Sequence, residues 1–190
     1  MSARLVDARA RPVGDRAATI AVLVGVAVLL VRPFAHVDAT TRTVLLAASY
    51  VTIELASIAV PLERDRARVS PGLTLWLGLG AVALAASVSG GPVPVPWSAA
   101  ALPLSVLAAV AEEALFRRLA YGRLERFGAG VAIVGSALLF GLVHVPAYGL
   151  AALPVDVGAG LLLGWQRWAS GTWTVPAATH VFANALVVLR

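Results

Sequence analysis

The stretch AGVAIVGSALLFGLVHV (residues 129–145) decides the fold class, because it runs for 17 residues without a charged side chain. As a helix it would be about 25 Å long, close to the hydrocarbon thickness of a bilayer of about 30 Å. Similar apolar stretches recur along the 190-residue chain, which predicts an all-α, polytopic integral membrane bundle of about seven transmembrane spans. The predicted spans are Ala17–Val31, Thr43–Val60, Gly72–Ser89, Ala99–Phe116, Ala129–Val145, Leu150–Trp165 and Trp173–Leu189.

The composition agrees with this fold class and excludes several others. Hydrophobic residues make up 59% of the chain and charged residues only 13%, whereas about 25% charged residues are usual in soluble domains. The absence of cysteine excludes a disulfide scaffold, thiolate zinc and a cysteine nucleophile. The net charge of +5 comes with arginines that flank apolar stretches. This pattern orients a protein in a lipid bilayer and does not indicate a nucleic-acid partner.

The arginines predict the orientation, since cytoplasmic loops carry an excess of positive charge. With seven spans, one side of the membrane holds three arginines, Arg32, Arg42 and Arg190. The other side holds Arg4, Arg9, Arg11, Arg16, Arg64, Arg66, Arg68, Arg117, Arg118, Arg123, Arg126 and Arg167. We therefore expect a multi-pass protein of the cytoplasmic membrane, with its N-terminus in the cytoplasm and its C-terminus outside.

Two adjacent carboxylates end the fourth predicted span. Glu113 and Arg117 are four residues apart, so they share a helix face and can pair, whereas Glu112 lies about 140° from Arg117. One interpretation is an ion pair at the membrane edge beside a solvated Glu112. The other is that Arg117 neutralises Glu113 while Glu112 stays free to accept a proton.

Polar groups inside membrane spans are costly and usually face a protein interior or a water-filled cavity. His144 ends the fifth predicted span, and the seventh contains His180 and Asn184 on one helix face. Gly128 is the natural turn between spans four and five, and Glu112 and His144 lie 16 residues to either side of it. Both then lie at the same height, so we expect Glu112, His144, His180 and Asn184 to line one cavity.

These residues form three ordered motifs: Glu112-Glu113 with Arg117, Phe140 with His144, and His180 with Asn184. Together they resemble the CAAX-protease and bacteriocin-processing (CPBP) family of intramembrane endopeptidases over about residues 100–190. One departure is Arg118, since glycine commonly follows the motif arginine in that family. The expected organisation is a cytoplasmic tail with three generic spans in residues 1–98, and a catalytic core of spans four to seven in residues 99–190.

The resemblance implies peptide-bond hydrolysis inside the membrane, on a lipidated or membrane-associated protein or peptide. It implies that Glu112 and His144 activate water, that His180 and Asn184 stabilise the oxyanion, and that Glu113, Arg117 and Phe140 support the site. A metal-free glutamic mechanism is favoured, with no cofactor. The alternative is zinc bound by Glu112, His144 and His180, because one carboxylate and two imidazoles also suit a catalytic zinc.

Two other functions compete with a protease. A small proton-coupled transporter or channel would need polar groups spread along a path, and a non-catalytic scaffold would not need an intact set of motif residues. Glu54 in the second span and Asp156 near the start of the sixth span stay without an assigned role; a hydrogen bond across the bundle and a helix cap are their simplest explanations.

Overall fold

The computed structural model describes residues 11–34, 36–60, 66–88 and 99–189, and their secondary structure is helical without a β-strand. The long helices are α1 (Arg11–Val31), α2 (Ala39–Ala59), α3 (Pro71–Val88), α4 (Ala101–Glu113), α6 (Ala129–Tyr148), α7 (Leu153–Ser170) and α8 (Thr174–Val188). Each of them overlaps one of the seven predicted segments, so the predicted all-α fold class is confirmed. The glycine- and proline-rich run 90–96 and the arginines at positions 4, 9, 64 and 190 lie outside the described residues.

Four of these helices are long and apolar enough to cross a membrane by length and composition: α1 with the turn η1 (Arg32–Phe34), α2, α3 and α6. The helix α8 is apolar but has only 15 residues. The helix α7 carries Asp156, Gln166 and Arg167 within its 18 residues. The chain is therefore a multi-pass membrane protein.

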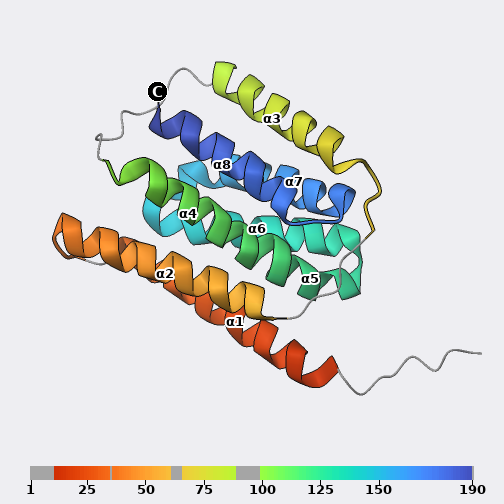
Figure 1. Cartoon of the computed structure of the whole chain (residues 1–190), viewed down its shortest axis with the longest axis horizontal. Coiled ribbons are helices and arrows are strands. Elements are labelled where there is room, and N and C mark those ends of the chain that lie inside the picture. The colour runs from red at the N-terminus through yellow and green to blue at the C-terminus, as the bar shows by residue number, and fades with distance from the viewer. Residues whose placement is uncertain (1–10, 35, 61–65, 89–98, 190) are drawn as a thin grey trace, which may run out of the picture.

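The helices form a layered bundle in which α4 lies between α2 on one side and α8 on the other (Figure 1). The α1–α2 pair covers one edge of the bundle, and α3 covers the opposite edge beside α7 and α8. The helix α6 packs closely on α7. This arrangement brings the motif side chains of α4, α6 and α8 together in the interior.

The fourth span differs from its predicted bounds of Ala99–Phe116. Helix α4 ends as an α-helix at Glu113, and the chain continues as a π-helix, η2 (Ala114–Ala120), followed by α5 (Tyr121–Leu124). A π-helix is rare and often marks a functional site. It was not foreseen, because periodicity does not distinguish a wide helical turn from an ordinary one. The wide turn directly follows the Glu112–Glu113 pair and contains Arg117.

Two glycines make turns next to the motif helices, and the one at Gly128 is the turn that the sequence predicted. Gly128 has φ +109° between α5 and α6, and Gly171 has φ +69° at the end of α7. Positive φ is strained for residues with a Cβ, so glycine is suited to both positions. The turn at Gly128 lets α6 run back beside α5 and η2 to the end of α4, as expected for an antiparallel hairpin.

Close approach of α6 and α7 depends on Gly160. A Cβ atom on Gly160 would lie 2.8 Å from the Ala137 Cα atom, whereas a Cβ on Gly158 would meet nothing within 4 Å. We expect Gly160→Ala to lower the free energy of unfolding by about 1–3 kcal/mol, because the two backbones must separate. Gly158→Ala is the matched control and should be neutral or slightly stabilising. Unfolding in detergent measures both, and equal stability of the two variants would contradict the packing argument.

Candidate active site

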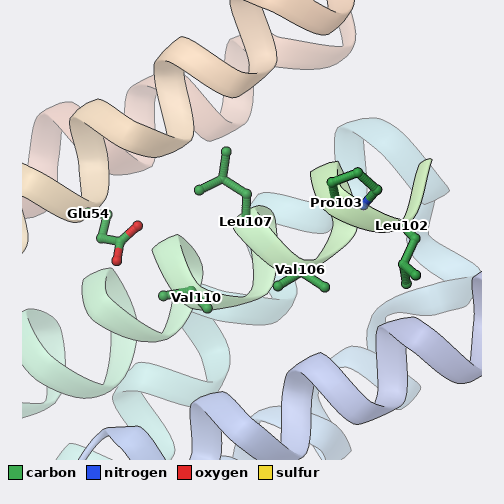
Figure 2. A pocket seen from close by; sticks show the side chains of 6 residues that line it. All are labelled: Glu54, Leu102, Pro103, Val106, Leu107 and Val110. Atoms are coloured by element: carbon green, nitrogen blue, oxygen red, sulfur yellow. The ribbon is translucent and has the colours of Figure 1, made fainter. Parts of the chain in front are cut away.

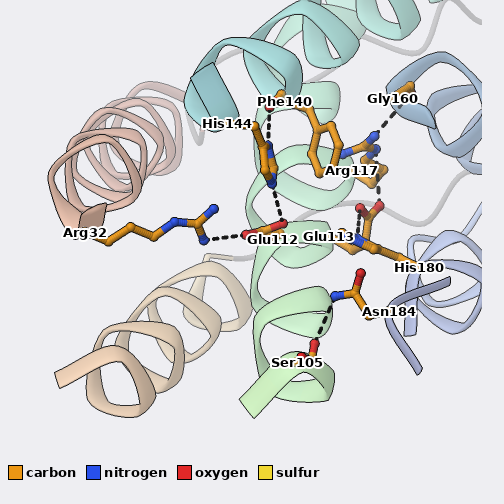
Figure 3. Close-up of polar contacts among 10 residues, drawn as sticks. All are labelled: Arg32, Ser105, Glu112, Glu113, Arg117, Phe140, His144, Gly160, His180 and Asn184. Carbon is orange, nitrogen blue, oxygen red and sulfur yellow. Dashed lines mark hydrogen bonds and ion pairs between the residues drawn. The ribbon is translucent and has the colours of Figure 1, made fainter. Parts of the chain in front are cut away.

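Two carboxylates at the end of α4 are each held by one guanidinium and one imidazole (Figure 3). Glu112 contacts Arg32 and His144, whereas Glu113 contacts Arg117 and His180. Both glutamates are buried, with exposed fractions of 3% and 0%. The two guanidinium groups therefore balance two carboxylates that would otherwise be costly to bury.

Glu112 joins three helical elements. Its Oε1 atom lies 2.7 Å from a terminal nitrogen of Arg32 in η1, and its Oε2 atom lies 3.6 Å from Nε2 of His144 in α6. The Nδ1 atom of His144 donates a hydrogen bond of 2.7 Å to the Phe140 carbonyl. In the neutral ring, the unprotonated Nε2 atom then faces the carboxylate of Glu112. The predicted meeting of Glu112 and His144 across the Gly128 turn is confirmed.

Glu113 makes a second, fully buried cluster. Its Oε2 atom lies 3.2 Å from Nε of Arg117, as the four-residue spacing predicted. Its Oε1 atom accepts a hydrogen bond of 2.9 Å from Nδ1 of His180 in α8. Arg117 also donates to the Gly160 carbonyl at 3.2 Å, which ties the cluster to α7.

The ring of Phe140 lies at the centre of the site. Its centroid is 4.6 Å from that of His144 and 5.5 Å from that of His180. The guanidinium carbon of Arg117 lies 4.6 Å from the same centroid, within the range of a cation–π contact. Phe140 thus forms a wall shared by both carboxylate clusters.

Asn184 lies one helical turn from His180 on the same face of α8. Its side-chain nitrogen donates to the Ser105 carbonyl in α4 at 3.2 Å, and an amide nitrogen carries a second N–H donor. The helix α8 is fixed in place by Gln166 of α7, which donates to the Thr179 hydroxyl and to the Thr74 carbonyl of α3. The residue before His180 is therefore anchored to α7 directly, and to α3 through Gln166.

Arg32 contacts Glu112 and Tyr50, and the sequence analysis predicted neither contact. The topology prediction counts Arg32 as a loop arginine, but its side chain turns inward and is only 12% exposed. The nitrogen that contacts Glu112 also donates to the Tyr50 hydroxyl at 2.9 Å. No sequence motif marks either residue. Arg32 directly follows the first predicted span and Tyr50 lies in the second, and both spans looked generic.

Arg118 and Arg167 bind backbone carbonyls around the π-helix. Arg118 donates to the carbonyls of Ser57, Ile58 and Val60 at the end of α2. Arg167 donates from Nε to the Arg117 carbonyl at 3.1 Å. The Arg118 side chain is thus accommodated at the protein edge, where it caps α2.

The two carboxylates without an assigned role lie in different places. Glu54 faces α4 across a pocket of about 480 Å³ whose other lining residues are apolar (Figure 2). Asp156 lies in the first turn of α7, which begins at Leu153, so it is not the residue at the cap. Its Oδ2 atom is buried without a hydrogen-bond partner among the described residues.

The three alternative zinc ligands are divided between the two clusters. Glu112 faces His144, but His180 uses Nδ1 to bind Glu113. Within the described part of the chain, no three His, Asp or Glu side chains are arranged to hold a metal ion. The donor set as arranged does not fit the proposed zinc site.

Comparison with known proteins gives one family. Residues 94–186 match the family model described as type II CAAX prenyl endopeptidase Rce1-like. The matched region contains Glu112, Glu113, Arg117, Phe140, His144, His180 and Asn184, but not Arg32 or Tyr50. No curated protein and no solved structure gave a significant match.

Proposed function

Because this chain belongs, through residues 94–186, to the Rce1-like family of type II CAAX prenyl endopeptidases, we propose that its site hydrolyses a peptide bond with water activated by Glu112 and His144. Membership of this family supports a CAAX-type intramembrane protease, and it implies a membrane-associated peptide or a prenylated protein as the substrate. The observation that supports this mechanism is the pairing of Glu112 Oε2 with His144 Nε2 at 3.6 Å.

The base in this proposal is Glu112. A neutral His144 whose Nδ1 proton is held by the Phe140 carbonyl presents only an acceptor at Nε2. A water molecule can donate one proton to each of Oε2 and Nε2, which leaves its lone pair free to attack a carbonyl carbon. As the new C–O bond forms, the water proton passes to Glu112, and it is then available for the leaving amine.

His180 and Asn184 are the proposed oxyanion donors. With Nδ1 bound to Glu113, His180 can donate from Nε2 only as the imidazolium, in which both ring nitrogens carry a proton. The carboxylate of Glu113 stabilises that positive charge, and Arg117 holds the carboxylate in place. The second N–H of the Asn184 amide is the other donor. Such fixed donors act most strongly where water is excluded.

A comparison of cellular peptides tests the activity whatever the substrate is. Mass spectrometry would compare membrane and lipidated peptides from cells that carry the wild-type protein with those from cells that carry Glu112→Gln. We expect at least one full-length peptide to accumulate, and its truncated form to disappear, in the variant. Identical peptide pools at equal protein levels would contradict the proposal.

The proposed mechanism uses no metal, in keeping with the division of the candidate ligands between Glu112 and Glu113. We expect dialysis against a chelator to leave hydrolysis unchanged, and elemental analysis to find far less than one zinc per chain. Zinc at one per chain, lost and restored together with activity, would instead make Glu112, His144 and His180 its ligands.

We also propose that the protein resides in the cytoplasmic membrane with its N-terminus inside and its C-terminus outside. The uneven distribution of arginines between the two sides supports this orientation. A reporter fused after Arg190 should be active only outside the cytoplasm. A cytoplasmic signal from that fusion, with the fusion protein still active as a protease, would overturn the orientation.

A further inference from the structure

The edge of the bundle formed by α1, η1 and α2 lies outside the matched family region, yet it reaches the candidate base. Arg32 approaches Oε1 of Glu112 at 2.7 Å, a distance typical of a charge-assisted hydrogen bond. The same nitrogen donates to the Tyr50 hydroxyl, so Tyr50 fixes where the guanidinium lies. The guanidinium carbon also lies 6.0 Å from the Tyr50 ring centroid.

Because of this contact, the two carboxylate oxygens of Glu112 have different partners. Oε1 is occupied by Arg32, so Oε2 alone faces His144. A buried carboxylate without a cation nearby favours its neutral form, in which it cannot act as a base. Arg32 therefore supplies two requirements of a general base, namely the ionised form and a fixed direction for the accepting oxygen.

We propose that Arg32, held by Tyr50, is a positioning residue that keeps Glu112 ionised and directs its Oε2 atom toward His144. This inference rests on the proposed function, in which Glu112 accepts the proton from water. It assigns to the α1–α2 edge a direct part in the reaction, in addition to its role in spanning the membrane.

The chain offers a matched control for Arg32. Arg42 of α2 lines the same pocket of about 420 Å³ between α1 and α2, together with Arg32. Within the described residues, Arg42 makes no ion pair with Glu112. Its replacement removes the same charge from the same pocket and leaves the base untouched.

Hydrolysis by variants tests the positioning role. We expect Arg32→Gln to lower kcat about 100-fold with little change in KM, because a misdirected catalytic group costs about that much. Tyr50→Phe should lower kcat about fivefold, which corresponds to one lost hydrogen bond. Arg32→Lys should recover part of the loss, and Arg42→Gln should match the wild type. A loss that falls on KM alone, or equal losses in Arg32→Gln and Arg42→Gln, would overturn the proposal.

Carbodiimide labelling tests the same contact without relying on activity. Dicyclohexylcarbodiimide reacts with protonated carboxyl groups in apolar surroundings, and mass spectrometry locates the adduct. We expect Glu112 to label weakly in the wild type and strongly in Arg32→Gln, while Glu54 labels equally in both. Unchanged labelling of Glu112 in the folded variant would overturn the inference. If the wild type cleaves no peptide, the proposed function fails, and labelling still reports whether Arg32 keeps Glu112 ionised.

Discussion

Glu112→Gln is expected to lower the rate of peptide hydrolysis by about 10²–10⁴-fold, the usual contribution of a general base. The glutamine has nearly the same size and can still accept a hydrogen bond from Arg32, so the variant should fold. It cannot accept a proton from water at working pH. The measurement is the single-turnover rate of peptide cleavage by purified protein in liposomes, with thermal unfolding to confirm the fold.

Two matched variants test whether the loss of hydrolysis is specific to Glu112. Glu113→Gln should retain measurable activity, because Glu113 contacts Arg117 and His180 and does not accept the proton from water in the proposed mechanism. Glu54→Gln changes a carboxylate in a separate pocket and should leave the rate unchanged. If Glu113→Gln were the less active of the two adjacent variants, the assignment of the base would be wrong.

Arg117→Met is expected to destabilise the protein by about 3–5 kcal/mol, because Glu113 would remain buried without its cation. The side chain is fully buried, and it also donates to Gly160 and lies over the Phe140 ring. Removing both charges in Glu113→Gln/Arg117→Met should cost less than removing Arg117 alone. The free energy of unfolding in detergent measures the difference.

The control for this prediction is Arg126→Met, since Arg126 is exposed at the end of η3 (Glu125–Phe127) and contacts the Phe127 ring. Its replacement should change stability by less than about 0.5 kcal/mol. A double variant as unstable as the sum of its two single variants would show that the buried pair is not coupled.

Sequence reasoning predicted the helices, the turns and most of the site because each depends on local rules. Apolar stretches give the helices, and glycine allows the positive φ at Gly128 and Gly171. Helical phase alone separates Glu113, which meets Arg117, from Glu112, which does not. Equal spacing about Gly128 places His144 at the level of Glu112.

The rest of the site depends on side chains that meet across the bundle, which no local rule specifies. Arg32 looks like any loop arginine, and only the packing of α1 against the rest of the bundle turns it toward Glu112. His180 binds Glu113 and not Glu112, because the two adjacent glutamates face different neighbouring helices. The π-helix after Glu113 lacks a known sequence signal and shifts the residues that follow.

The most direct test of the central claim uses purified protein in liposomes with a farnesylated peptide that ends in a free carboxylate. Mass spectrometry of the reaction in ¹⁸O-labelled water identifies both products and the origin of the attacking oxygen. We predict that the wild type releases a C-terminal fragment and leaves one ¹⁸O atom in the new carboxylate of the lipidated product, before and after chelator treatment. Glu112→Gln should release almost none. Equal cleavage by both proteins, or no cleavage of this or the corresponding non-lipidated peptide by the wild type, would contradict the account.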